Sequence, residues 1–455
     1  MPTAYTILFL LLILVAAATW IIPAGSYDYV DGVPVAGTYH TVEQNPQGVG
    51  DVLKAAFSGF YDAVDVCIFI LMVGGFLGVV MKTGAVDAGV GNVIRLLGGR
   101  EKWLIPILML LFGLGGTTYG MWEETMAFYP LLIPVFLAAG YDAVVGISVI
   151  LLGAGAGVIA STVNPFATGI AAGFAGVSLG EGIVLRLLEW VAFEAAAIWF
   201  VMAYAAKVKK NPSKSVVGVG AGKIQVSMDQ QVPFTAKRKV IMALFTLTFL
   251  IMVYAVVPFD EMGLSLPALG WWFPELSALF LVAGVVMGLM DRLGEVELAE
   301  TFISGCTDLL GVAFIIGISR GITVLMNDGA ITDTVLHWGE QALSGAGAIS
   351  FTLLVFALYL PLTILIPSSS GLATLSIPIV APLGKFAGVG GDLVVTAFQS
   401  ASGLVNIITP TAAVVMGALA LGHVPYDRWV KYVWKLILWF LLLALAFLVA
   451  GVLLG

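Results

Sequence analysis

Long apolar stretches separated by short polar segments run along nearly the whole chain. About 20 apolar residues cross a bilayer as a helix. Uninterrupted stretches of roughly that length predict spanning helices at 5–22, 64–81, 183–206, 240–257, 271–290, 309–326 and 433–454. The predicted fold class is therefore an all-α polytopic membrane protein.

Two further apolar stretches, 103–140 and 348–388, are too long for one span and carry a polar segment in the middle. The first tip runs from Gly113 to Thr125 and reads Gly-Leu-Gly-Gly-Thr-Thr-Tyr-Gly-Met-Trp-Glu-Glu-Thr. The second tip runs from Pro367 to Gly371 and reads Pro-Ser-Ser-Ser-Gly. Non-helical backbone at membrane depth persists only where protein or water satisfies it, so each stretch predicts a re-entrant hairpin.

Each hairpin is followed by a helix that is predicted to be broken. The helix at 143–176 is interrupted by the first break, Ser161-Thr-Val-Asn-Pro165, and the helix at 393–421 by the second break, Asn406-Ile-Ile-Thr-Pro-Thr411. A proline removes a backbone donor and frees upstream carbonyl groups. We expect the two tips and the two breaks to meet at one site for a small solute.

Basic residues predict how the chain is oriented. The loop after 64–81 carries Lys82, Arg95, Arg100 and Lys102, and the segment 207–239 carries eight Lys or Arg and one acid. Lys and Arg mark cytoplasmic loops. The expected organisation is a first unit at 1–206, a basic cytoplasmic linker at 207–239 and a second unit at 240–455. It places the N-terminus in the cytoplasm and the C-terminus outside a bacterial inner membrane.

The two units resemble each other as internal repeats. Met81-Lys-Thr-Gly-Ala-Val matches Met326-Asn-Asp-Gly-Ala-Ile, and the spacing of Pro130, Pro134 and Gly140 recurs at Pro378, Pro382 and Gly388. Asn164-Pro-Phe-Ala matches Thr409-Pro-Thr-Ala. The extra span at 271–290 inverts the second copy. Inverted repeats with broken helices are typical of secondary transporters.

Composition excludes several other classes of protein. The chain is 60% hydrophobic and 11% charged, more apolar than a soluble domain of 455 residues can bury. Its two cysteines and three histidines form no metal-ligand spacing, so we expect no prosthetic cofactor. No motif of an intramembrane enzyme is present. A channel is the other alternative, but an inverted repeat within one chain favours alternating access.

The polar residues of the tips and breaks are the candidate ligands of a substrate. Glu123 and Glu124 are costly at membrane depth and require a cationic group, a proton or Na⁺, unless one faces water and the other pairs with a base. Arg320 either holds a substrate carboxylate, neutralises Glu123 or Glu124, or forms a purely structural ion pair. The substrate-binding candidates are Thr117, Thr118, Glu123, Glu124, Asn164, Arg320, Ser369, Ser370, Asn406 and Thr411.

Three other polar residues are expected to play lesser roles. Asp65 and Glu194 are predicted to be solvated near helix ends, and Gln399 to form a hydrogen bond between helices. At the breaks, freed backbone carbonyl groups and side-chain oxygens are suitable ligands for Na⁺. The alternative is that each break is a proline kink whose freed carbonyl groups accept hydrogen bonds from neighbouring hydroxyls.

The motifs Gly120-Met-Trp-Glu-Glu-Thr, Ser161-Thr-Val-Asn-Pro-Phe, Pro367-Ser-Ser-Ser-Gly and Asn406-Ile-Ile-Thr-Pro-Thr resemble those of the YfcC-like basic amino acid antiporters. These belong to the anaerobic C4-dicarboxylate carriers, within the ion transporter superfamily. The resemblance covers nearly the whole chain. It implies a homodimer in membrane lipid, with a scaffold and a mobile transport domain that moves as an elevator.

The resemblance also implies Na⁺ sites at the second tip and at both breaks. The matching residues are Ser161, Thr162, Asn164, Ser368, Ser369, Asn406, Thr409 and Thr411. The second break departs from the compact Ser-Asn-Thr pattern of the superfamily, which leaves H⁺ open as the coupling ion.

The sequence therefore predicts a secondary transporter for an amino acid, with arginine and ornithine as candidates, working by exchange or cation coupling. The alternative is a transporter for a C4-dicarboxylate or another carboxylate, coupled to Na⁺ or H⁺.

Overall fold

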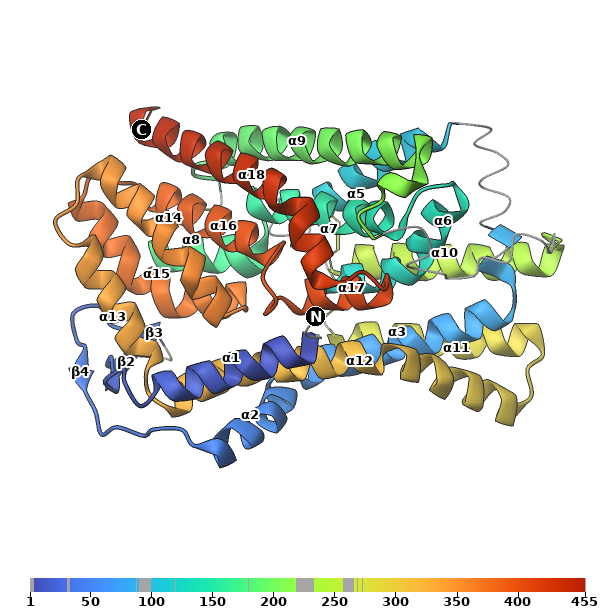
Figure 1. Ribbon diagram of the computed structural model, residues 1–455, viewed down its shortest axis with the longest axis horizontal. Coiled ribbons are helices and arrows are strands. Elements are labelled where there is room, and N and C mark those ends of the chain that lie inside the picture. The colour runs from blue at the N-terminus through green and yellow to red at the C-terminus, as the bar shows by residue number, and fades with distance from the viewer. Residues whose placement is uncertain are drawn as a thin grey trace.

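The computed structural model is almost entirely helical (Figure 1). It describes residues 4–30, 33–86, 88–89, 100–118, 120–178, 180–217, 233–256, 266–267, 269–271 and 273–454. Most of the basic linker (218–232), Arg95 and the tip residue Tyr119 lie outside the described residues.

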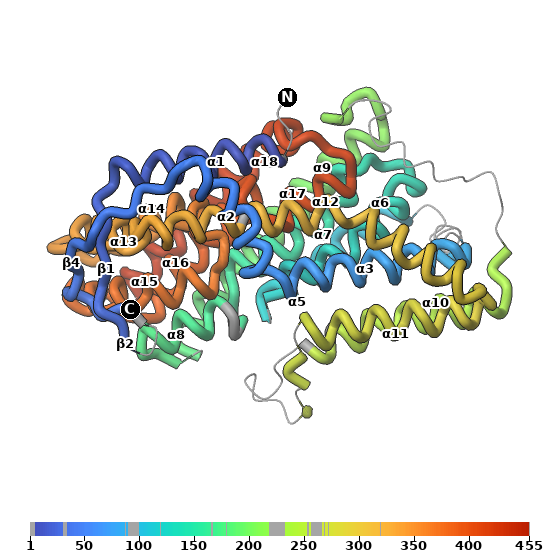
Figure 2. Tube along the Cα trace, turned by 90° about the horizontal axis from the view of Figure 1, so that it is seen from below, coloured from blue at the N-terminus to red at the C-terminus, as the bar shows by residue number. Residues whose placement is uncertain are grey.

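One layer of the molecule consists of long helices that run side by side along the lower part of Figure 1. They are α1 (Ala4–Ala18), α2 (Val49–Asp62), α3 (Val64–Lys82), α11 (Phe273–Asp291) and α12 (Glu295–Asp328). Helix α12 packs along both α2 and α3 through glycines: a Cβ on Gly59 would lie 2.1 Å from the carbonyl oxygen of Gly317. Helix α10 (Ala236–Val256) packs beside α11, and this pair extends from the body in Figure 2.

The first unit continues through two interrupted helix pairs. Their elements are η1 (Glu101–Trp103), α5 (Leu104–Thr118), η2 (Glu123–Phe128), α6 (Tyr129–Ala138), α7 (Ala143–Ile159), η3 (Pro165–Gly169) and α8 (Ile170–Ala175). Asp142 caps α7 by accepting a hydrogen bond from the backbone N–H of Val145 at 3.0 Å. The unit ends with α9 (Ile183–Lys210) and a short turn, η4 (Pro212–Lys214).

The rest of the second unit follows α12. Its elements are α13 (Thr332–Leu343), α14 (Ala348–Leu365), α15 (Ser369–Phe386), α16 (Gly391–Asn406), α17 (Ala413–Leu421) and α18 (Tyr426–Leu454). Helices α7 and α16, which precede the two breaks, are buried along almost their whole length and form the centre of the molecule. Helices α9 and α18 cross the upper surface in Figure 1.

Four two-residue strands pair at one end of the molecule. They are β1 (Gly25–Ser26) with β4 (His40–Thr41), and β2 (Tyr29–Val30) with β3 (Val33–Pro34), both antiparallel. This segment lies against α13 and α15. At the opposite end, Lys82 pairs with Glu297 at 3.1 Å and Lys209 with Glu101 at 3.0 Å, so the basic segments gather there.

Five described helices are long and apolar enough to cross a membrane: α3, α11, α12, α14 and α18. Most predicted spans agree with observed helices, but several limits differ. Helix α1 ends at Ala18 rather than at residue 22, α18 begins at Tyr426 rather than at residue 433, and α2 forms where no span is predicted. Helix α12 begins at Glu295, well before residue 309, because its charged first turns are stabilised by packing against α3.

Candidate functional site

The first tip is a short irregular turn that is bound to the first break. Helix α5 extends through Thr118, so the predicted tip is helical over its first half. The carbonyl oxygen of Thr117 accepts hydrogen bonds from Thr162, from its backbone N–H at 2.9 Å and from its hydroxyl at 2.9 Å. The Thr117 hydroxyl donates to the carbonyl oxygen of Ala160 at 2.8 Å. The end of α5 thus satisfies backbone groups that the first break exposes.

Gly120 brings the tip and the break into direct contact. Its φ of +79° favours glycine, and a Cβ there would lie 2.5 Å from Nδ2 of Asn164. Within the break, the Thr168 hydroxyl donates to Ser161 Oγ at 2.7 Å. Thr118 instead donates to the carbonyl oxygen of Leu114 at 2.6 Å, within its own helix. In this conformation Thr117, Thr118, Ser161 and Thr162 all bond within the protein.

The two glutamates of the first tip have different surroundings. Glu124 is buried, and its Oε2 accepts from the backbone N–H of Trp122 at 3.1 Å, so it caps the turn that contains it. Glu123 lines a small cavity that Glu124 does not reach. Sequence alone could not separate these neighbouring residues.

The second tip is capped by its own serine. Ser368 Oγ accepts from the backbone N–H of Gly371 at 3.2 Å and lies 3.4 Å from Ser370 Oγ. Ser369 is the half-buried first residue of α15. From this tip, Pro367 lines the same cavity as Glu123.

The second break is held open by the start of α18. The Trp429 indole N–H donates to the carbonyl oxygen of Ile407 at 3.1 Å, and the Tyr426 hydroxyl donates to that of Ile408 at 2.8 Å. The hydroxyls of Thr409 and Thr411 are 2.9 Å apart. Two aromatic residues of α18 therefore satisfy carbonyls that the break leaves without helical partners.

Asn406 ends α16 with an unsatisfied polar atom. Its side chain is 5% exposed and faces the cavity, and its Oδ1 has no hydrogen-bond partner among the described residues. A buried carbonyl without a partner is destabilising by about 1–3 kcal/mol, which points to a ligand at this position.

The small cavity brings both tips and the second break together. Its volume is about 40 Å³, and it is lined by Val66, Trp122, Glu123, Ile316, Arg320, Pro367, Asn406, Thr411, Ala412, Ala413 and Val414. The first break lies behind the first tip and does not line it. Gly155 of α7 connects the two regions, because a Cβ there would lie 3.0 Å from Ile407 and 3.7 Å from Trp122.

Arg320 faces this cavity from the middle of α12. Its Nε lies 3.8 Å from Oδ2 of Asp62 at the end of α2, and it also acts electrostatically on Glu123. Arg320 thus forms an ion pair with Asp62 in this conformation, and it also lines the cavity.

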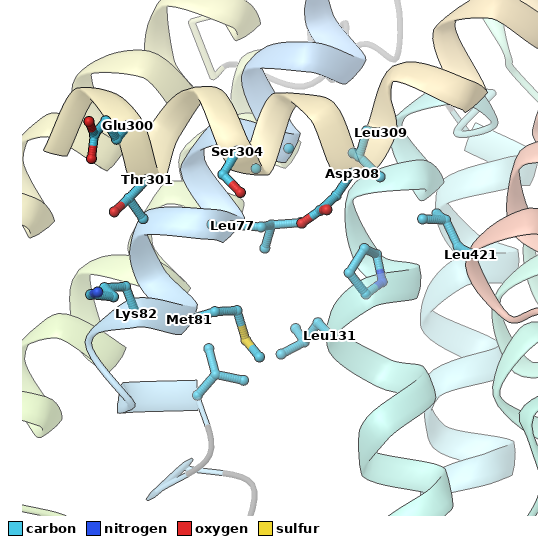
Figure 3. Close-up of a pocket in the computed structure, with 15 residues that line it drawn as sticks. Leu77, Met81, Lys82, Leu131, Glu300, Thr301, Ser304, Asp308, Leu309 and Leu421 are labelled. Atoms are coloured by element: carbon cyan, nitrogen blue, oxygen red, sulfur yellow. The ribbon is translucent and has the colours of Figure 1, made fainter. Parts of the chain in front are cut away.

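Two larger cavities lie farther along α12, away from the tips and breaks. One, of about 680 Å³, is bounded by α3, α6 and α12, with Asp308 and Ser304 facing Met81 and Leu131 (Figure 3). The other, of about 890 Å³, shares Asp308 and Leu421 with the first and extends to Ile315 and Met416. Along α12, Ile315 lines the second of these cavities and the next residue, Ile316, lines the small cavity.

Three polar residues outside the tips were also assigned roles from the sequence. Gln399 does form the expected hydrogen bond, from Nε2 to the carbonyl oxygen of Val158 at 2.6 Å, and Asp65 is exposed. The prediction for Glu194 was wrong: it is 2% exposed and lies in the middle of α9. Buried Arg186 and Glu189 on the same helix were missed, although their spacing of three residues places them on one helix face.

His337 lies in α13. Within the described part of the chain, no group of three or more His, Cys, Asp or Glu is placed to hold a metal ion.

The chain matches one family over almost its full length. The model of the DcuC family, described as C4-dicarboxylate anaerobic carrier, matches residues 1–453. A protein of Haemophilus influenzae, named only as uncharacterised, is 35% identical over 503 residues, with 99% of this chain and 97% of that protein covered. The "Putative basic amino acid antiporter YfcC" of Escherichia coli is 31% identical over 480 residues, with 95% and 92% covered.

Two solved structures are loosely similar. The YdaH transporter of Alcanivorax borkumensis has a TM-score of 0.45 and 14% identity, with 98% of each chain covered. MtrF of Neisseria gonorrhoeae, described with a class of antimetabolite efflux pumps, has a TM-score of 0.44 and 16% identity, with 98% of this chain and 94% of that chain covered. With TM-scores this low, neither structure defines the fold of this chain.

Proposed function

Because the chain belongs to the DcuC family, the C4-dicarboxylate anaerobic carriers, we propose that it is a secondary transporter, and that its substrate is an amino acid. The observation that carries the substrate class is the small cavity lined by one carboxylate, Glu123, and one guanidinium, Arg320. An amino acid presents an ammonium to the first and a carboxylate to the second. Arginine and ornithine are the first candidates, and the name of the relative YfcC supports this choice.

Glu123 is the residue that recognises the ammonium group in this proposal. Glu124 is already engaged by the Trp122 backbone N–H and does not line the cavity. Among the other candidates, Asn406 and Thr411 line the cavity and complete the substrate site. Asn164, Ser369 and Ser370 are assigned to the surrounding layer, which changes when the tips move.

The cavity must enlarge before a substrate can bind. A volume of about 40 Å³ is close to the space of one water molecule, far less than an amino acid needs. The two larger cavities on α12 provide the route. A substrate released from the tips would pass between α12 and α17 toward the basic end of the molecule, which we assign to the cytoplasm.

The proposed mechanism is alternating access by an elevator-like motion. The two units are inverted repeats, α5–α6 and α14–α15 are re-entrant hairpins, and the protein is a homodimer in the bacterial inner membrane. The order of elements supports the repeat: α2 and α3, separated only by Ala63, have α12 as their counterpart, and each unit then continues with a hairpin, a broken helix and a long final helix.

The coupling ion is assigned to the breaks. Asn406 Oδ1 and the hydroxyls of Thr409 and Thr411 provide hard oxygen ligands of the kind that Na⁺ prefers. The other predicted Na⁺ ligands would bind the ion in a different conformation, in which their present hydrogen bonds are broken. They are Ser161, Thr162, Asn164, Ser368 and Ser369. A proton is the alternative coupling ion.

A dicarboxylate is the second candidate substrate. Residues 412–414, at the N-terminal end of α17, line the cavity next to Arg320, and a helix N-terminus favours an anion. The description of the family model favours the same class. Glu123 opposes it, because a second carboxylate would face the glutamate unless a proton or Na⁺ intervened.

Competition in proteoliposomes separates the two candidates. Vesicles containing the purified protein are loaded with ornithine, and uptake of labelled arginine is measured. We expect competition by external ornithine and lysine but not by succinate. Labelled succinate uptake that ornithine leaves unchanged, without arginine uptake, would overturn the amino acid assignment in favour of a dicarboxylate.

A further inference from the structure

Helix α9 buries a carboxyl group that the proposed site does not use. Glu194 lies in the middle of this helix and is 2% exposed. Its carboxyl group fills the space left by Gly113 on α5, because a Cβ on Gly113 would lie 2.4 Å from Glu194 Oε2. The absence of a side chain at Gly113 is what allows the carboxyl group to fit between the helices.

Neither oxygen of Glu194 has a hydrogen-bond partner among the described residues. Helices α5 and α7, which pack against α9, contain no ionisable residue. On α18, Phe440 packs edge-to-face against Phe193, the neighbour of Glu194, and lies beyond Lys435, the last ionisable residue of that helix. Among the described residues, Glu194 thus forms no ion pair and no hydrogen bond; the indole N–H of Trp190, four residues earlier on α9, is likewise buried without a partner.

Apart from the lysines of its last turn, the other charged residues of α9 belong to a separate cluster closer to the start of the helix. It consists of Arg186, Glu189 and Asp392 of α16, which interact electrostatically. Arg186 is eight residues from Glu194, about 12 Å along the helix axis. Glu189 also accepts a hydrogen bond from the Ser400 hydroxyl at 2.8 Å. Glu189 therefore has a hydrogen-bond donor at one oxygen and interacts with Arg186, while its Oε2 has no partner among the described residues; Glu194 has no partner at either oxygen.

We propose that Glu194 is a proton-binding site whose carboxyl group carries a proton in this conformation and releases it in another conformation of the transport cycle. A buried carboxylate without a partner is strongly disfavoured, and a neutral carboxyl group avoids that penalty. Releasing the proton requires water or a cation to reach the carboxylate, and therefore requires α5 and α9 to separate.

The position of Gly113 connects this proton to the tips. Gly113 lies one turn before Thr117, the residue that holds the first break. Both face α7 closely: a Cβ on Gly157 would lie 2.2 Å from the carbonyl oxygen of Gly113 and 2.7 Å from the backbone nitrogen of Thr117. A movement of α5 away from Glu194 would therefore move the end of α5 and the first tip with it. Coupling of the proton to substrate movement rests on the proposed transport function; the protonation state of Glu194 does not.

Infrared spectroscopy tests the protonation without any substrate. The full-length wild-type protein, E194Q and E189Q are compared in lipid at neutral pH. Glutamine keeps the size of a protonated carboxyl group, so E194Q is expected to fold. We expect E194Q to lose a component of the protonated-carboxyl C=O band that E189Q retains. An unchanged band in E194Q would overturn the proposal.

Transport assays test the coupling. In proteoliposomes, E194Q is expected to retain exchange of labelled arginine for internal arginine and to lose acceleration of uptake by a pH gradient. Acceleration equal to that of the wild type, or loss of exchange and acceleration together, would overturn the coupling role. If the wild-type protein transports no arginine, the proposed substrate is wrong, while the infrared result still decides whether Glu194 holds a proton.

Discussion

Single side chains determine which part of the site can bind a ligand. Glu123 and Glu124 are neighbours, yet one lines the cavity and the other caps its own turn. Asn406 differs from Glu124, because it lines the cavity and its amide oxygen has no hydrogen-bond partner in the part of the chain that the structure describes. A cation bound at this unsatisfied oxygen would stabilise the protein more than a cation bound at an oxygen that already accepts a hydrogen bond.

Removing the Asn406 amide tests the assignment of the ion. For the wild-type protein we expect a higher unfolding temperature in Na⁺ than in choline, since Na⁺ at about ten times its Kd adds about 1.4 kcal/mol. N406A should abolish that difference. Fluorescence-monitored thermal unfolding in detergent measures both.

The matched control is S148A, which removes a buried hydroxyl of α7 bonded to the carbonyl oxygen of Val144. It should keep the Na⁺ response. A Na⁺-dependent shift of normal size in N406A would remove Asn406 from the ion site.

At the scale of elements, close helix packing through glycine holds the interrupted helices together. Helix α5 meets α7 at Gly113, Gly116, Gly153 and Gly157, where backbones touch without side chains between them. Small residues at such crossings allow the backbone contacts that stabilise helix pairs in lipid, where the hydrophobic effect contributes little.

G157A should therefore separate α5 from α7. The added methyl group would lie 2.2 Å from the Gly113 carbonyl oxygen, and overpacking of this kind typically destabilises by about 1–3 kcal/mol. We expect a lower unfolding temperature and reduced transport. In G173A on α8, the methyl group would meet nothing within 4 Å, so stability should stay the same or rise. Equal effects of the two substitutions would contradict this account of the crossing.

A cluster of tyrosines fixes the strand segment to α13. The Tyr29 hydroxyl donates to Asp333 at 2.8 Å, the Tyr27 hydroxyl donates to Glu340 at 2.8 Å, and Tyr39 stacks on His337. Burial, and then the hydrogen bond to the Glu340 carboxylate, raise the pKa of Tyr27 above its ordinary value. The folded state therefore favours the neutral phenol. This stabilisation is complete below the ordinary tyrosine pKa of about 10 and is lost as the pH rises through the raised value.

Y27F should loosen this segment at neutral pH. It removes a hydrogen bond to a charged group, a loss of about 1.5–3 kcal/mol, while keeping the ring. We expect faster proteolysis within residues 25–41. Y61F is the control, because Tyr61 is 83% exposed. Alkaline pH above about 10 should accelerate cleavage of the wild type more than that of Y27F. Cleavage of Y27F at the wild-type rate would show that the bond does not hold the segment.

The structure of the whole molecule agrees with the prediction from sequence where a local motif determines the structure. It differs from the prediction where residues distant in the sequence determine it. Asp142 and the Ser161–Pro165 motif fix the limits of α7, and both are readable locally. The start of α12 depends on packing with α3, and the burial of Glu194 depends on a glycine some eighty residues earlier. Which glutamate of the first tip faces the cavity depends on a turn that no periodic pattern specifies.

Orientation is a property of the whole molecule that labelling can test. With Cys67 and Cys306 replaced by alanine, we expect an impermeant maleimide to label D328C in intact cells and K214C only after the membrane is opened. Lys214 lies in the basic linker, and Asp328 is the last residue of α12. Both residues are exposed. The reverse pattern would invert the proposed topology.

We propose that the cavity between the two tips and the second break binds the ammonium group of an amino acid through Glu123. The decisive measurement is exchange of labelled arginine in proteoliposomes, compared between E123Q and E124Q. We expect E123Q to lose exchange and E124Q, whose glutamine still accepts from the Trp122 backbone, to retain most of it. Exchange by E123Q at the wild-type rate would show that Glu123 does not bind the ammonium group.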